Sequence, residues 1–243
     1  MTPTLITIPI SHYGERARWA LDRSGRAYRE VHHLQMFSWL YALGHGGKKT
    51  LPVLRTADGV VNDSGDIMRW ADPTLYPTDD VFDRELAGEY GDCTRRVAYS
   101  WFFGDLDRFW PFNVGRAPRY ERVLLRSAMP LGKAFLRRYL SVNDTEVARA
   151  RDVVMHMLDR VAAVLADGRP FLHGDRFTGV DLTFATMTAP VIAPPHYGVP
   201  LPSVDELAPN AADTVRSMRA HPAGAYAMRL YEGRPPVAAQ YDR

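Results

Sequence analysis

Three neighbouring side chains near the start of the chain could carry chemistry: Ser11, His12 and Tyr13. They stand where an apolar run, LITIPI, gives way to a charged pattern rich in alanine and leucine, typical of a helix. The first turn of a helix carries unpaired N–H groups and partial positive charge, so it favours an anion. Ser11 precedes that turn and can donate its hydroxyl hydrogen to such an anion. The structural alternatives are that Ser11 only caps the helix, His12 is exposed and Tyr13 packs in the core.

A second anion site is predicted at Ser64, which opens a helix in the segment NDSGDIM. The sequence contains no comparable pattern of metal-ligating residues. His32 and His33 are adjacent on a predicted strand and therefore point to opposite faces. The chain has neither an HExxH motif nor paired cysteines, so no metal site is predicted.

Composition limits the classes of partner. The 243 residues include 30 basic and 28 acidic ones, mixed along the chain, so no nucleic-acid partner is predicted. A single cysteine, Cys93, rules out an intramolecular disulfide and agrees with a cytoplasmic location. The first residues do not resemble a signal peptide. The apolar run LQMFSWLYAL is too short to span a bilayer, so no membrane partner is predicted either.

The elements that must position these residues alternate in the first part of the chain. We expect strands at 4–10 and 27–34, a helix at 13–24 that stops at Gly25, and a short helix within 36–43. An Asp-Gly hairpin turn at 57–59 follows, and then a helix from Ser64. The order is βαβαββα, an α/β domain. In the helix 13–24, Tyr13, Ala17, Ala20, Leu21 and Ser24 share one face, with Arg16, Arg18, Asp22 and Arg23 mostly outside it.

The second part of the chain is predicted to be all helical. Residues 74–82 contain a proline and show no hydrophobic periodicity, so we expect a linker there, between a domain at 1–73 and a domain at 83–243. Helices are expected at roughly 83–110, 117–140, 143–167, 178–190 and 209–231. The sharpest local signal is FTGVDLTF, where Thr178 and Asp181 form a capping box and Phe177 and Leu182 occupy the staple positions.

Four segments, in this order, resemble the cytosolic glutathione S-transferases: SHYGERARWAL, TLPVL, VVNDSGDIMRWA and FLHGDRFTGVDLTFA. The resemblance implies a thioredoxin-like N-terminal domain followed by an all-α helical-bundle domain. It also implies glutathione as co-substrate and a cytoplasmic homodimer active in detoxification.

The resemblance assigns roles to individual residues. Ser11 stands at the family's Ser-type, tau/omega-like active-site position and would stabilise the glutathione thiolate, with Tyr13 as second candidate. Leu51 and a cis Pro52 would hold the cysteinyl part, and Asp63 and Ser64 the γ-glutamyl part. Either Lys48 or Lys49 would meet the glycyl carboxylate. The turn Ser-His-Tyr-Gly lacks both cysteines of the glutaredoxin turn, which excludes dithiol chemistry there.

The aromatic segment 95–112 supplies candidates for an electrophile pocket, chiefly Tyr99, Phe102 and Phe103. Residues 101–103 are consecutive and cannot all face one side of a helix, so core packing is the alternative for each of them. The predicted function is transfer of glutathione to a small hydrophobic electrophile. Because Asp63 replaces the family's usual glutamate, Asp66 its alanine and Thr50 its lysine, the alternative is a non-catalytic ligand carrier or interaction scaffold. A different low-molecular-weight thiol is a third hypothesis.

Overall fold

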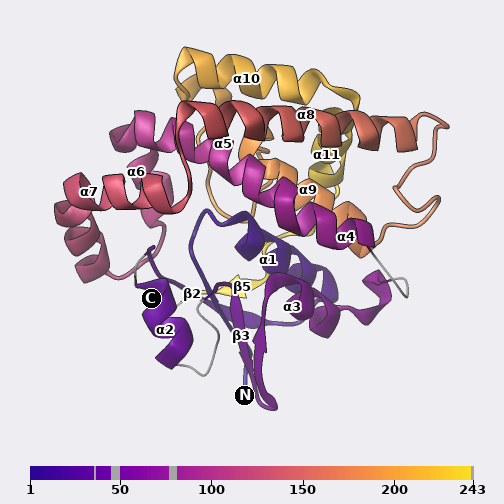
Figure 1. Ribbon diagram of the computed structural model, residues 1–243. Coiled ribbons are helices and arrows are strands. Elements are labelled where there is room, and N and C mark those ends of the chain that lie inside the picture. Colours follow the sequence, from indigo (N-terminus) through magenta and orange to yellow (C-terminus); the bar gives the residue numbers. More distant parts are fainter. Residues whose placement is uncertain (36, 45–49, 77–80, 242–243) are drawn as a thin grey trace.

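The computed structural model describes residues 1–35, 37–44, 50–76 and 81–241. Its first part follows the predicted βαβαββα order, and the fold class is confirmed (Figure 1). The elements are β1 (Thr4–Thr7), α1 (His12–Ser24), β2 (Tyr28–His32), α2 (Ser38–Gly44), β3 (Val53–Thr56), β4 (Gly59–Asn62) and α3 (Ser64–Ala71).

The strands form one mixed sheet in the order β4-β3-β1-β2-β5. β1 runs parallel to β2 and antiparallel to β3, and β3 and β4 form the predicted hairpin with Thr56 opposite Gly59. The fifth strand, β5 (Ala239–Gln240), was not predicted. It pairs parallel to β2 and comes from the other end of the chain, so a two-residue segment without a period of its own completes the sheet.

The helical part begins with two short segments, Pro73–Leu75 and α4 (Val81–Glu85), and a π turn at Leu86–Tyr90. The longer helices are α5 (Gly91–Gly104), α6 (Leu106–Val114), α7 (Arg119–Tyr139), α8 (Asp144–Leu165), α9 (Gly179–Ile192), α10 (Pro209–Ala220) and α11 (Pro222–Glu232). A 3-10 turn at Val204–Glu206 precedes α10. Part of the predicted linker, residues 77–80, lies outside the described residues, and the domain limits stay a prediction.

Two predicted helices are each divided in the structure. The helix expected at 83–110 ends at Gly104, because Asp105 turns the backbone and its carboxylate caps α6 by accepting a hydrogen bond from the Arg108 N–H. The helix expected at 209–231 breaks at His221, since the residue before a proline is pushed out of the helical region. Its φ of −66° and ψ of 139° are those of extended backbone.

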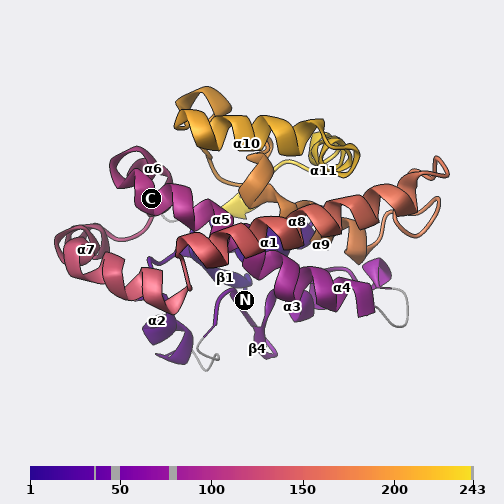
Figure 2. The same cartoon turned by 45° about the horizontal axis from the view of Figure 1, so that its top comes forward.

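α9 is the central helix of the second part and contacts α1, α5, α10 and α11 (Figures 1 and 2). It is apolar on nearly all sides, as expected for a helix covered all round. The predicted capping box is confirmed: the Asp181 carboxylate accepts hydrogen bonds from the N–H and the hydroxyl of Thr178, at 2.7 and 2.9 Å. No helix of the described residues has the length and apolarity to cross a bilayer.

α1 is buried on more sides than its sequence pattern predicts. It packs against α3 on one side and α9 on another, so Arg16, Arg18 and Asp22 are buried rather than solvated. Arg18 is neutralised by Glu15 at 2.6 Å and by Glu30 of β2 at 2.7 Å. These charges lie outside the predicted apolar face and are nevertheless buried, because Glu30, Asp83 and Arg234 from other parts of the chain pair with them.

The segment that follows α11 supplies more of those partners. Arg234 donates hydrogen bonds to Glu15 at 2.8 Å and to Asp22 at 2.9 Å. The Tyr241 hydroxyl donates to Glu30 at 3.0 Å, next to β5. Residues 234–241 therefore balance charge buried beneath the N-terminal sheet.

Candidate active site

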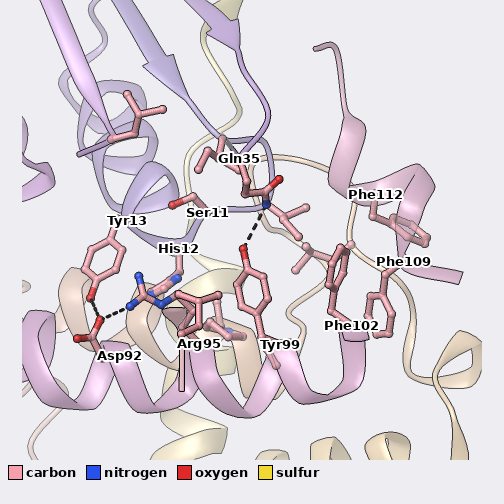
Figure 3. Close-up of a pocket in the computed structure, with 18 of the residues that line it drawn as sticks. Ser11, His12, Tyr13, Gln35, Asp92, Arg95, Tyr99, Phe102, Phe109 and Phe112 are labelled. Atoms are coloured by element: carbon pink, nitrogen blue, oxygen red, sulfur yellow. Dashed lines mark hydrogen bonds and ion pairs between the residues drawn. The ribbon is translucent and has the colours of Figure 1, made fainter. Parts of the chain in front are cut away.

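A cavity of about 720 Å³ lies where the ends of β1 and α3 meet the aromatic face of α5 (Figure 3). The first part of the chain contributes Ser11, His12, Tyr13, Gln35, Thr50, Leu51, Pro52, Asp63 and Ser64 to its lining. The helical part contributes Asp92, Arg95, Tyr99, Phe102, Phe109, Phe112, Phe135 and Tyr139, among others. The cavity thus has a polar end and an apolar, aromatic end.

Ser11 is the N-cap of α1. Its Oγ accepts a hydrogen bond from the Gly14 N–H at 3.2 Å, which leaves its own hydroxyl hydrogen to donate. The side chain lines the cavity at the positive end of the helix. Hydroxyl and helix end together favour an anion, and a thiol placed here would have a lowered pKa.

His12 is buried, with 4% of its surface exposed, so the expectation of an exposed side chain is wrong. Its ring lies against that of Tyr13, with centroids 4.3 Å apart. Its Nε2 has no hydrogen-bond partner among the described residues. Burial, reinforced by the Arg95 cation, lowers the pKa of His12 from 6.5 to about 3. The imidazole is therefore neutral at physiological pH.

Tyr13 has its phenolic hydrogen engaged elsewhere. The hydroxyl donates to the Ala87 carbonyl at 2.9 Å and lies 3.2 Å from the Asp92 carboxylate, toward which it points in Figure 3. Burial and the charge of Asp92 raise the pKa of this phenol well above its usual range. Arg95 pairs with the same carboxylate at 2.8 Å. This geometry favours Ser11 over Tyr13 as donor to a ligand.

The remaining sequence candidates form the wall opposite the helices. The Leu51-Pro52 peptide bond is cis, as the resemblance implied. Asp63 caps α3 by accepting from the Gly65 N–H at 2.8 Å, and its φ of 73° places it in the left-handed region. Ser64 is buried beside it at the first turn of α3. Lys48 and Lys49 lie outside the described residues.

No sequence pattern indicated the role of Arg16. Its guanidinium is buried and donates to Asp83 at 2.6 Å, to the Tyr76 hydroxyl at 3.0 Å and to the Ser64 Oγ at 3.4 Å. The Ser64 hydroxyl accepts from Arg16 and keeps its hydrogen for the cavity side. Asp83 also accepts from Thr183 of α9. This arginine ties α1 to both α3 and the helical part.

Two of the three predicted aromatic residues line the cavity: Tyr99 and Phe102. Phe103 does not, and that prediction is corrected. It packs in a core cluster with Leu136 and Val142, because one residue along a helix rotates the side chain by about 100°.

Gln35 was not predicted at this site. Its amide donates to the Tyr99 hydroxyl at 3.2 Å and to Asn113 at 2.9 Å, and so fixes the orientation of Tyr99 (Figure 3). Neither Arg96 nor Cys93 lines the cavity. Arg96 donates a hydrogen bond to the Leu140 carbonyl, and Cys93 is a buried free thiol. Among the described residues, no group of three or more His, Cys, Asp or Glu is arranged to hold a metal ion.

Two family models match the chain. Residues 5–76 match "Glutathione S-transferase, N-terminal domain" and residues 144–214 match "Glutathione S-transferase, C-terminal domain". No curated protein matches.

Solved structures of similar fold extend over nearly the whole chain. A glutathione S-transferase of Ceriporiopsis subvermispora, in complex with glutathione, is 16% identical at a TM-score of 0.61, covering 96% of this chain and 97% of its own. The transferase GSTFuA2 of Phanerochaete chrysosporium is 14% identical at a TM-score of 0.63, and the match covers 98% of this chain and 99% of that protein. A glutathione S-transferase of Methylobacterium radiotolerans, in complex with glutathione sulfonate, is 21% identical at a TM-score of 0.53, and the match covers 100% of this chain and 99% of that protein.

Proposed function

Because this chain belongs to the glutathione S-transferase family, we propose that it binds glutathione at the polar end of the cavity and transfers it to a hydrophobic electrophile. The observation that carries the proposal is the single cavity shared by Ser11, the cis Leu51-Pro52 bond, Ser64 and the aromatic side chains of α5. The complexes of the C. subvermispora and M. radiotolerans proteins with glutathione and glutathione sulfonate agree with this ligand.

The cysteinyl and γ-glutamyl parts of glutathione each have a matching group on this wall. An extended peptide pairs with an exposed backbone, and the residue before a cis proline offers that pairing to the cysteinyl part. The γ-glutamyl carboxylate would accept from the Ser64 hydroxyl and from N–H groups of the first turn of α3. The γ-glutamyl ammonium would lie near Asp63, although one Asp63 oxygen already accepts from Gly65.

The chemical step requires a thiolate. With its sulfur beside Ser11, glutathione would lose the thiol proton to solvent while the Ser11 hydroxyl donates to the sulfur anion. The thiolate then attacks an electrophilic atom held against Tyr99 and Phe102, and the electron pair moves to the leaving group or the opened bond. His12 is neutral and adds no positive charge, so the hydroxyl and the end of α1 carry the stabilisation.

Calorimetric titration tests the binding step. Glutathione and S-hexylglutathione are titrated into the protein, and both are expected to bind, the second more tightly because its alkyl chain enters the aromatic end. A Ser64→Ala variant is expected to bind glutathione more weakly, since the carboxylate loses a donor. The absence of binding at millimolar glutathione would overturn the proposal.

The second candidate is a non-catalytic ligand carrier, favoured by the large, mostly apolar lining of the cavity. Turnover of chlorinated aromatics, epoxides, isothiocyanates and hydroperoxides separates the two. Glutathione binding without turnover of any of these would favour the carrier. A homodimeric state and a cytoplasmic, detoxifying role belong to the same proposal.

A further inference from the structure

The apolar residues exposed on this protein are concentrated on one part of its surface. Of twelve large hydrophobic side chains that are exposed among the described residues, eight lie on α2 and α7. They are Leu40, Leu43, Tyr120, Val123, Leu124, Leu131, Phe135 and Tyr139, which we call the α2–α7 face. Leu131 is 85% exposed and Tyr139 74%. When many large apolar side chains are exposed together on one part of a folded protein, they mark a site of interaction.

The two helices form one continuous surface. The Tyr41 hydroxyl of α2 bonds the Tyr120 hydroxyl of α7, and Phe37 meets the Tyr120 ring edge-on at 6.4 Å. α2 and α7 lie side by side in both views of the ribbon (Figures 1 and 2). α6 and α7 fall within residues 77–143, which neither family model matches. The α7 part of this face therefore lies outside both family matches.

The charge of α7 limits what can cover the face. The helix holds six basic residues and one acidic residue, Glu121, and that glutamate is buried against His33. The basic residues are Arg119, Arg122, Arg126, Lys133, Arg137 and Arg138. Two copies related by a two-fold axis would bring these cations against one another, which disfavours a self-contact here. An anionic partner is complementary.

We propose that the α2–α7 face docks on an anionic lipid bilayer surface. Exposed leucine and aromatic side chains beside arginines, on a helix that spans no membrane, are the composition of a helix lying at the interface. The face shares its edge with the cavity, because Phe135 and Tyr139 are exposed and also line it. Docking would turn this rim toward the bilayer, where hydrophobic electrophiles partition. The expectation of no membrane partner considered spanning segments alone, and this proposal revises it.

Flotation of the full chain with vesicles tests the proposal without glutathione, so its outcome is independent of catalysis. Vesicles of phosphatidylcholine and phosphatidylglycerol are expected to carry the protein up the gradient, whereas pure phosphatidylcholine carries much less. Raising the salt concentration weakens the binding, because most of these cations are exposed and are therefore screened by salt. Arg119→Gln and Arg138→Gln are each expected to weaken binding to the anionic vesicles about fivefold, the equivalent of ~1 kcal/mol per cation.

The apolar contribution is tested with Val123→Gln, Leu124→Gln and Leu131→Gln combined, three residues that do not line the cavity. Val81→Gln with Arg151→Gln is the matched control, since both are exposed away from the face. Loss of flotation in the first variant with retention in the control supports the proposal. No flotation of the wild type at low salt, or equal flotation of both variants, overturns it. A change of oligomeric state in the face variant would assign the α2–α7 face to a second copy of this chain. Binding to an acidic protein but not to vesicles would assign the face to a protein partner. Either result overturns the lipid proposal.

Discussion

Replacing His12 by phenylalanine should remove an acid sensitivity that burial builds into the fold. His12 is 4% exposed, and its pKa falls from 6.5 to about 3 in the folded protein. The unfolded chain therefore binds a proton at this residue between these two pH values and the folded chain does not. The contribution to stability is complete above the unfolded pKa and is lost as pH falls from 6.5 toward 3.

The size of the effect follows from this window. At pH 5 the imidazole of the unfolded chain is almost fully protonated, which costs the folded state about 2 kcal/mol relative to pH 7 or above. For a chain of this length, that free energy corresponds to a fall in Tm of about 4 to 8 °C. Phenylalanine keeps a ring against Tyr13 and has no proton to bind. Wild type is thus expected to lose about 2 kcal/mol more than His12→Phe between pH 7 and pH 5.

The measurement is urea denaturation of both proteins at pH 5, 6 and 7. His156→Phe is the matched control, because it removes an imidazole that is exposed. The pH dependence of His156→Phe should follow that of wild type, and His12→Phe should be the flatter curve. If wild type and His12→Phe lose the same free energy of unfolding between pH 7 and pH 5, the argument from burial is wrong.

Three further predictions concern the site and its support. Ser11→Ala should raise the pKa of bound glutathione thiol by about 1 to 2 units, the equivalent of a lost hydrogen bond to a charged group; an unchanged thiolate absorbance titration would assign the role to another donor. Arg16→Met should lower the free energy of unfolding by about 3 to 5 kcal/mol, because the buried Asp83 carboxylate loses the cation that lies 2.6 Å away; urea denaturation showing a loss below about 1 kcal/mol would contradict this. Gly224→Ala should lower the Tm by about 6 to 12 °C, the equivalent of about 3 kcal/mol, since its Cβ would lie 1.8 Å from the Met218 carbonyl oxygen. Gly233→Ala, with 3.6 Å to the nearest atom, is the control for that variant, and equal Tm values for the two would refute the steric argument.

Features that depend on neighbours in sequence could be predicted. The hairpin at 57–59, the capping box of Thr178 and Asp181, and the stop at Gly25 each use residues a few positions apart, and all three are present. The βαβαββα order follows from the same local patterns.

Features that depend on distant partners could not be predicted. Arg16 lies outside the apolar face that the sequence predicts, and its partners Ser64, Tyr76 and Asp83 are 48 to 67 positions away. His12 was expected to be exposed, but it is buried in the folded chain. Phe103 belongs to the same aromatic run as Phe102, and only the packing of α5 in the folded chain decides which one lines the cavity. The pairing of β5 with β2 joins two ends of the chain and has no local signature.

The hydrogen bond from Arg234 to Glu15 joins residues 219 positions apart. A ribosome adding 5 to 20 residues per second therefore takes roughly 10 to 40 s between making the two. During that interval α1 and the first four strands leave the exit tunnel with Glu15 and Asp22 still lacking this cation. The first domain thus reaches its final charge balance only after the helical domain has been synthesised, so the two mature as one unit during translation rather than in succession.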